Sequence, residues 1–303
     1  MINQMLNDVV VEGKVNKINL EDFSFEDKEH PEITRKAIRG EVEVKVVMPI
    51  EKGGEPIVLM IPIRVFKKQY SKKGLEENKE DTTYLNLKKL MDEKKSIATV
   101  GEDEAECVRF THCNMVMAEF PSKNDGTLVT FPQISGTFMN FVSASEMSPK
   151  AKVEMEGIIH RMSTRMVGDV EYLDIICANV GWGETTHLIP FTTCNSSYIA
   201  AFQEQYEKGD PIDLTAVINF SATVETITKE VAIGEPEVIT KTRNKHDLVI
   251  SSAKNAMLNV DEDELKSCLD KREQRIAEVL ARRQAPVGSR TKEVEKQKVA
   301  LGF

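Results

Sequence analysis

The chain contains the same order of landmarks twice, and this internal repeat restricts its fold more than any other feature. LMIPIRVF (residues 59–66) and HLIPFTTC (residues 187–194) are apolar runs broken by an Ile-Pro pair, and each precedes a tyrosine that opens a helical segment. Before them lie VEGKVNKI (residues 11–18) and MEGIIHRM (residues 155–162), two apolar segments interrupted by glycine. A repeat of this kind indicates that one structural unit has been duplicated.

Each unit is predicted to contain three strands, a helix and two further strands. The second strands are GEVEVKVVM and VEYLDIICANV, and the Ile-Pro runs are the third. YLNLKKLMDEKK and YIAAFQEQYEKGD carry apolar residues at helical spacing. Strands then resume at SIATV and CVRFTH in the first unit and at PIDLTAVINF in the second, and the units close on MNFVSAS and DLVISSA. This order is that of the five-stranded OB barrel.

Glycine and proline positions agree with that barrel. Gly13 and Gly157 fit the bend by which strand one serves both halves of a small barrel. Pro62 and Pro190 each remove a ladder hydrogen bond, so we expect them at a strand edge or a bulge. The predicted fold is therefore mainly β with short helices: two tandem OB-fold-like five-stranded barrels plus a C-terminal helix.

The predicted organisation has three parts. Residues 1–148 form a first OB-like domain with insertions at residues 23–37 and 119–135, and residues 149–255 form the second. Residues 256–303 give a C-terminal helix and a basic flexible tail. Asp261 and Glu264 form a capping box at the start of this helix. Its apolar stripe either folds back on the second barrel or pairs with another chain, which would make a homo-oligomer.

Over residues 8–254 the chain resembles the tandem OB folds of single-stranded DNA-binding proteins, of the kind that bacteria and their phages use. The resemblance implies a non-enzymatic protein that coats single-stranded DNA with little sequence preference in replication or recombination. It would act in the cytoplasm, or in the host cytoplasm if the protein is viral. The chain departs from the bacterial pattern by ending in KQKVALGF instead of an acidic tip with a terminal Pro-Phe.

The resemblance places the ligand across strands two and three, gripped by neighbouring loops, where cations hold phosphates and flat rings stack on bases. Trp182, the sole tryptophan, lies between two glycines and would either stack on a base or pack over the barrel mouth. The basic run after strand three would bind phosphates or serve only as a solvated loop. The candidate nucleic-acid-binding residues are Lys14, Lys17, Arg39, Lys45, Arg64, Phe66, Lys67, Lys68 and Tyr70 in the first unit, and Arg161, Arg165, Tyr172, Trp182, Lys241, Arg243 and Lys245 in the second.

Composition limits other functions. The net charge of −9 argues against a protein that only coats phosphates, although a cleft can be positive on an acidic body. The chain lacks a phosphate-binding glycine loop, a dinucleotide fingerprint, an HExxH motif and a GxSxG motif, so we expect neither enzymatic activity nor a cofactor. Five scattered cysteines indicate neither a disulfide framework nor a zinc site, and no apolar run is long enough to span a membrane.

The expected partners follow from the same reasoning. Single-stranded DNA is the first, and replication or recombination proteins are expected at the C-terminal tail, which offers Leu301 and Phe303. The alternative to DNA binding is a non-enzymatic structural or assembly protein, a virion or scaffold component built from tandem β-barrels.

Overall fold

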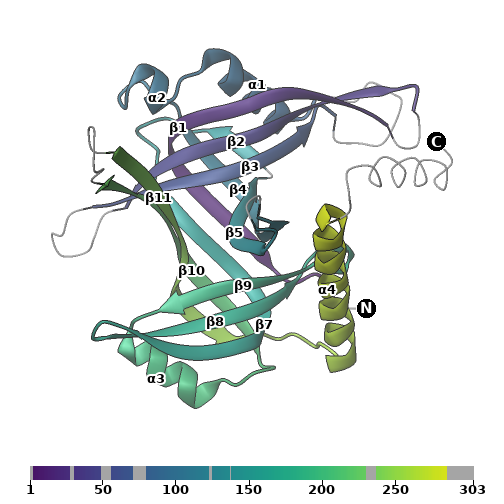
Figure 1. Ribbon diagram of the computed structural model, residues 1–303. Coiled ribbons are helices and arrows are strands. Elements are labelled where there is room, and N and C mark those ends of the chain that lie inside the picture. Colours follow the sequence, from purple (N-terminus) through teal and green to yellow (C-terminus); the bar gives the residue numbers. More distant parts are fainter. Residues whose placement is uncertain are drawn as a thin grey trace.

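Two barrels of five strands, each with a helix between its third and fourth strands, make up the protein (Figure 1). The computed structural model describes residues 3–27, 31–48, 56–70, 80–122, 125–136, 138–229 and 237–284, without the side chains of residues 222–229, 237–244 and 282–284. Leu301, Phe303 and the rest of the predicted basic tail lie outside these residues.

The first barrel has the predicted strand order. Its elements are β1 (Asn7–Glu26), β2 (Thr34–Met48), β3 (Ile57–Lys68), α1 (Thr82–Glu93), α2 (Ile97–Val100), β4 (Cys107–Pro121), β5 (Leu128–Gly136) and β6 (Phe138–Phe141). β1, β2 and β3 form an antiparallel meander, and β3 then pairs in parallel with β5. β4 pairs with β5 and with β1, so the barrel closes in the order β1-β2-β3-β5-β4-β1. β6 continues the fifth strand along β4.

The second barrel repeats this topology. Its elements are β7 (Lys150–Val167), β8 (Val170–Val180), η1 (Trp182–Glu184), β9 (Thr186–Thr193), α3 (Ser196–Gln205), β10 (Pro211–Lys229) and β11 (Glu237–Asn255). It closes in the order β7-β8-β9-β11-β10-β7, again with a parallel bridge between the third and fifth strands. The helix α4 (Glu262–Gln284) follows. The predicted fold, two OB-type barrels plus a C-terminal helix, is confirmed.

Gly13 and Gly157 lie where the first strand of each barrel changes partners. β1 pairs with β4 up to Lys14 and with β2 from Lys14 onward, and a Cβ on Gly13 would lie 2.3 Å from the Lys45 carbonyl oxygen. Gly157 has the same position in β7, with the Ala178 carbonyl oxygen 3.0 Å from its hypothetical Cβ. Only glycine permits the two strands to approach this closely, as the bend in strand one predicts.

The barrels join through their first strands. β1 pairs with β7 in antiparallel register, with Val9 opposite Val153, and the pair Asn7–Met155 is mirrored by the pair Val11–Ala151. Val153 is as far from Val9 in the sequence as Gly157 is from Gly13, so Val9 and Val153 are equivalent positions of the two barrels. Because these equivalent residues pair with each other, the join has approximate two-fold symmetry. The result is one continuous sheet of eleven strands. The domain boundary expected at residues 148–149 stays a prediction.

One local prediction was wrong. SIATV was expected to be a strand, but it forms α2 after Ser96, because the Ser96 amide donates to Thr99 Oγ1 at 3.0 Å and fixes a helical turn. The two expected insertions in the first barrel lie in strand hairpins, and their assignment as insertions stays a prediction. Residues 23–37 prolong the β1–β2 hairpin, and residues 119–135 belong to the β4–β5 hairpin.

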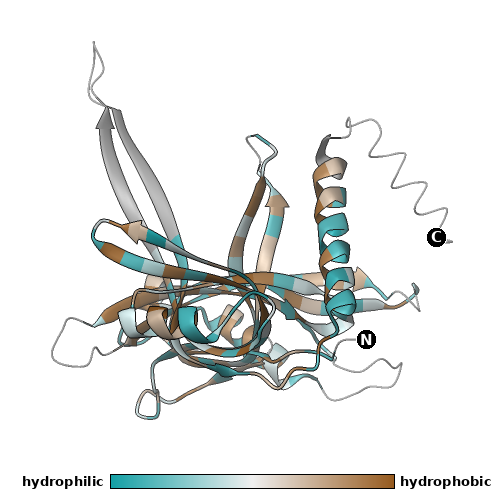
Figure 2. Ribbon diagram, turned by 90° about the horizontal axis from the view of Figure 1, so that it is seen from below, coloured by the Kyte–Doolittle hydropathy of each residue, from teal (hydrophilic) through white to brown (hydrophobic). Residues whose placement is uncertain are grey.

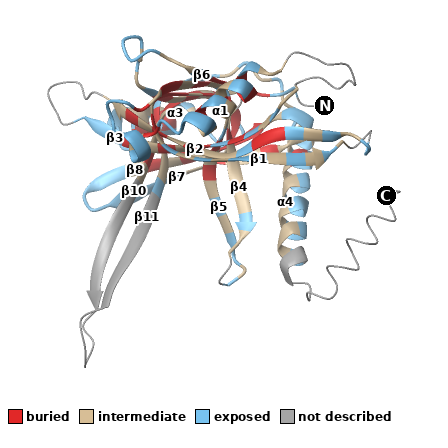
Figure 3. Cartoon of the chain, turned by 90° about the horizontal axis from the view of Figure 1, so that it is seen from above, coloured by how far each residue is buried: buried red, intermediate tan, exposed pale blue. Residues whose placement is uncertain are grey.

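The distal part of the β4–β5 hairpin, residues 117–122 and 125–132, packs against the second barrel. We call this part the arm. The Phe131 ring lies 5.2 Å from the ring of His246 on β11, and the Met117 amide donates to His187 Nδ1 on β9 at 3.3 Å. Figures 2 and 3 show the arm and α4 projecting from one face of the molecule.

The helix α4 packs on its own chain. Cys268 and Leu265 lie in a small apolar cluster with Met5, Ile158 and Val180, from the N-terminal segment and the second barrel. Arg272 and Arg275 donate to the buried carboxylate of Glu119 on the arm. Folding back is therefore the observed alternative, and a homo-oligomer through α4 stays a prediction. Within the described chain, none of the helices has both the length and the apolarity that crossing a bilayer requires.

His187 makes the contact with the arm sensitive to acid. Burial lowers the pKa of His187 to about 4, helped by Arg275, and its Nδ1 must be unprotonated to accept from Met117. The unfolded chain, with an ordinary histidine pKa of about 6.5, therefore binds the proton more readily. The free energy of unfolding should fall as the pH drops from about 6.5 to about 4, with His187 contributing at most about 3 kcal/mol.

Melting temperatures of the parent and His187→Gln measured across this pH range test the prediction. Glutamine keeps an acceptor for Met117 without titrating, so the variant should lose less stability in acid. The stability of the variant should still depend partly on pH, because burial also lowers the pKa of His160 and His246. The exposed His112 provides the control, His112→Gln. If the parent and His187→Gln lose the same stability in acid, His187 is not responsible for the loss.

Candidate nucleic-acid interface

The outward face of β1, β2 and β3 carries most of the candidate residues of the first barrel. In β2 the alternate residues Val42, Val44 and Val46 are buried in the core, so the residues between them point outward. Cross-strand pairing places Glu21, Arg39 and Phe66 in one row and Asn19, Glu41 and Arg64 in the next. We call this surface the groove face. Its candidate residues are Lys14, Lys17, Arg39, Lys45, Arg64, Phe66 and Lys68.

Three phenylalanines form an aromatic cluster on the groove face. The ring centroids of Phe23, Phe25 and Phe66 lie 5.9 to 6.1 Å apart. The Arg39 guanidinium lies 4.0 Å from the Phe23 centroid, and Lys68 Nζ lies 5.4 Å from that of Phe25. Phe66 remains 51% exposed. An exposed ring held by other rings and flanked by cations is a preformed platform for stacking.

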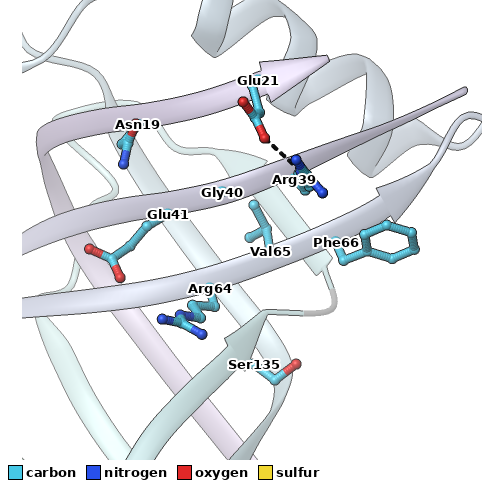
Figure 4. Close-up of a pocket in the computed structure, with 9 residues that line it drawn as sticks. All are labelled: Asn19, Glu21, Arg39, Gly40, Glu41, Arg64, Val65, Phe66 and Ser135. Carbon is cyan, nitrogen blue, oxygen red and sulfur yellow. Dashed lines mark hydrogen bonds and ion pairs between the residues drawn. The ribbon is translucent and has the colours of Figure 1, made fainter. Parts of the chain in front are cut away.

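A groove of about 520 Å³ lies beside this cluster (Figure 4). Figure 4 shows Arg39 and Phe66 at one end, and Arg64 and Ser135 at the other. Gly40 forms part of its floor with a φ of 138°, and a Cβ there would lie 2.0 Å from the Asn19 carbonyl oxygen. Glycine is therefore required here, because β1 and β2 approach each other too closely for a Cβ.

The cations of the groove face differ in their partners. Arg39 pairs with Glu21 at 2.6 Å, and Lys17 lies 3.9 Å from Glu43. Arg39, Glu21 and Lys17 are exposed and Glu43 is partly exposed, so each pair stabilises the fold little and can exchange its carboxylate for a phosphate. Arg64 and Lys68 have no carboxylate partner among the described residues.

Four candidate residues lie at the margins of the groove face or beyond it. Lys14 and Lys45 both bind Glu102 near one end of the face, and the hydrogen bond from Lys45 lowers the pKa of Glu102. Lys67 points to the opposite side of β3, where its Nζ lies 3.2 Å from Asp81 and 4.9 Å from the Phe138 centroid. Tyr70 lies just beyond the end of β3.

In the second barrel the candidate residues are dispersed. The guanidinium of Arg165 lies 4.7 Å from the Tyr172 centroid, and Lys245 pairs with Asp247 at 2.7 Å. Arg161 is exposed on β7, and Trp182 is 85% exposed in the short helix η1. The side chains of Lys241 and Arg243, in the β10–β11 hairpin, lie outside the described part of the chain.

Phe23 and Phe25 belong to the aromatic cluster but are absent from the sequence-based candidates. The segment FSFE alternates aromatic and polar residues, as a strand with one apolar face does. This alternation marks both rings in the sequence, although the segment is predicted to be an insertion.

Comparisons with known proteins agree with the fold. A family model described as YorF matches residues 6–281. The chain belongs to the YorF family. No curated protein matches the sequence of this YorF chain.

Solved structures resemble the YorF chain at low sequence identity. A deletion mutant of the single-stranded DNA binding protein from Thermus aquaticus is 9% identical, with a TM-score of 0.50, and the match covers 86% of the YorF chain and 98% of the other. The wild-type Thermus aquaticus protein is 10% identical, with a TM-score of 0.49 and coverages of 86% and 97%. At this identity the likeness establishes the fold alone.

Proposed function

We propose that this chain binds single-stranded DNA with little sequence preference, through the groove face of the first barrel. The observation that carries the proposal is the aromatic cluster, in which the half-exposed ring of Phe66 packs against Phe23 and Phe25. Arg39 lies over the Phe23 ring and Lys68 over the Phe25 ring. Bases would stack on the ring, and the cations would neutralise phosphates, a combination that tolerates any sequence. The fold shared with a protein named for single-stranded DNA binding supports this choice of ligand.

The proposed role is the coating of strands that are exposed during replication or recombination. Stacking and phosphate neutralisation hold a strand without breaking a bond in it, so the proposal includes no catalytic step. Partner proteins at the C-terminal tail belong to the same proposal.

Fluorescence anisotropy of a labelled oligo-dT of about 30 nucleotides tests the proposal. We expect binding at micromolar protein or below in low salt, and an affinity that falls steeply as salt rises, because phosphate contacts release counterions. RNA of equal length and duplex DNA show whether the strand type matters. If the oligo-dT gives no change at micromolar protein in low salt, the structural or assembly role becomes the better explanation.

Two neighbouring lysines should differ in how they affect salt dependence. Lys68→Ala should flatten the plot of log affinity against log salt by about 0.7 units, the loss of one phosphate contact on a single strand. Lys67→Ala should leave that slope nearly unchanged, because Lys67 points away from the groove face to Asp81. The sequence alone predicted that both would contribute. Equal flattening by both substitutions would mean that the strand passes around the edge of β3.

A further inference from the structure

The repeat allows the two barrels to be compared position by position. Pro62 pairs with Glu43, and Pro190 pairs with Ile176, so the third strands have equivalent registers. Two residues further on, Arg64 pairs with Glu41, and Thr192 pairs with Asp174.

The aromatic and cationic groups of the groove face are not repeated at these positions. Arg64 corresponds to Thr192, and Phe66 corresponds to the exposed thiol of Cys194. Arg39, opposite Glu21, corresponds to Tyr172, opposite Arg165. The second barrel thus has one aromatic ring where the first has a cluster of three.

The equivalent face of the second barrel is also occupied by its own contacts. Asp174 accepts from Thr192 Oγ1 at 2.8 Å and from Arg165 Nε at 2.5 Å. Held in this way, Arg165 covers the ring of Tyr172. A base could stack on Tyr172 only by displacing the Arg165 guanidinium, whereas the cations of the first barrel lie over Phe23 and Phe25 and not over Phe66. Arg161 is the cation of this face that has no carboxylate partner among the described residues.

Unlike Tyr172, Trp182 lies outside the sheet face of the second barrel. It lies in the β8–β9 connection, where Gly183 and Glu184 have φ values of 64° and 59°. Glu184 pairs with Lys271 of α4, which ties this turn to the helix. The indole is 85% exposed and has no ring or cation contact with another described residue. Of the two alternatives for Trp182, packing over the barrel mouth is not observed, and the indole is open to solvent.

We propose that the two barrels contact single-stranded DNA unequally, the first through its whole groove face and the second through Trp182 instead of its sheet face. This inference rests on the proposed function. A short strand that fills the groove face should therefore bind with most of the affinity, and a longer strand should gain the contact with Trp182. One OB barrel occupies roughly 4–16 nucleotides, which sets the two lengths to compare.

The experiment measures binding of oligo-dT of about 10 and about 35 nucleotides by anisotropy, together with the emission of the single tryptophan. Phe66→Ala should weaken binding of both lengths by roughly 5- to 150-fold. Tyr172→Ala, at the equivalent face of the second barrel, should change neither by more than about twofold. Trp182→Ala should weaken the longer oligonucleotide by about tenfold and leave the shorter one unchanged. Only the longer one should quench the emission of the parent. Thermal melting of each variant confirms that it is folded.

The outcomes separate the inference from the function on which it rests. If neither oligonucleotide binds the parent, the proposed function fails. If both bind, and Tyr172→Ala weakens them as much as Phe66→Ala does, the barrels contribute equally and the inference is overturned. Equal quenching of Trp182 by both lengths would also overturn it, because the strand would then start at the second barrel.

Discussion

Replacing Phe66 by alanine is expected to weaken binding of single-stranded DNA by roughly 5- to 150-fold, with little change in its salt dependence. The range corresponds to about 1–3 kcal/mol for the loss of one stacking platform. Phe66 is the exposed member of the aromatic cluster, and Phe23 and Phe25 hold its ring in place. Anisotropy titrations at several salt concentrations measure both the affinity and its salt slope.

Phe138→Ala is the matched control. Phe138 is also exposed, at 44%, but it lies beside Lys67 and His112 and not on the groove face. Its replacement should change the affinity by no more than about twofold, because it removes no stacking platform from the groove face. If both alanine variants weaken binding equally, the strand does not follow the groove face.

Replacing Glu119 by glutamine should lower the free energy of unfolding by about 3–5 kcal/mol, because it removes one partner of a buried ion pair. The Glu119 side chain is only 7% exposed and accepts from both Arg272 and Arg275. Arg272 Nε is already buried without a hydrogen-bond partner, so the loss would leave this guanidinium poorly compensated. The contact joins α4 to the arm. We expect a lower melting temperature and faster amide hydrogen exchange in α4.

Glu93→Gln controls for the removal of a charge. Glu93 also lies between two cations, Lys89 at 3.8 Å and Lys95 at 3.4 Å, but all three side chains are partly or largely exposed. Such pairs contribute about 0–1 kcal/mol. If Glu119→Gln melts like Glu93→Gln, with unchanged exchange in α4, then the arm and the helix do not depend on this contact.

The fold could be predicted because its signals are local and occur twice. The apolar run with an Ile-Pro pair forms the third strand of each barrel. Gly13 and Gly157 lie where the first strand changes its pairing partner. Asp261 was expected to cap α4, and its carboxylate accepts from the Asp263 amide at 2.8 Å. None of these features requires knowledge of a distant contact.

The contacts of the arm could not be predicted in this way. Glu119 and Arg272 are far apart in the sequence, and each has the usual features of a surface residue until the arm and α4 meet. Lys67 and Lys68 are a different case, since strand alternation alone places consecutive residues on opposite faces. Grouping them as one basic run ignored that period.

The symmetric pairing of β1 with β7 has a consequence for assembly. Strand edges that pair in this way are self-complementary, so two copies of a single barrel could form the same join without a covalent link. Such a dimer would dissociate on dilution. In the duplicated chain each edge instead meets its partner at the high effective concentration that a short connection provides. We therefore expect that dilution does not separate these two barrels.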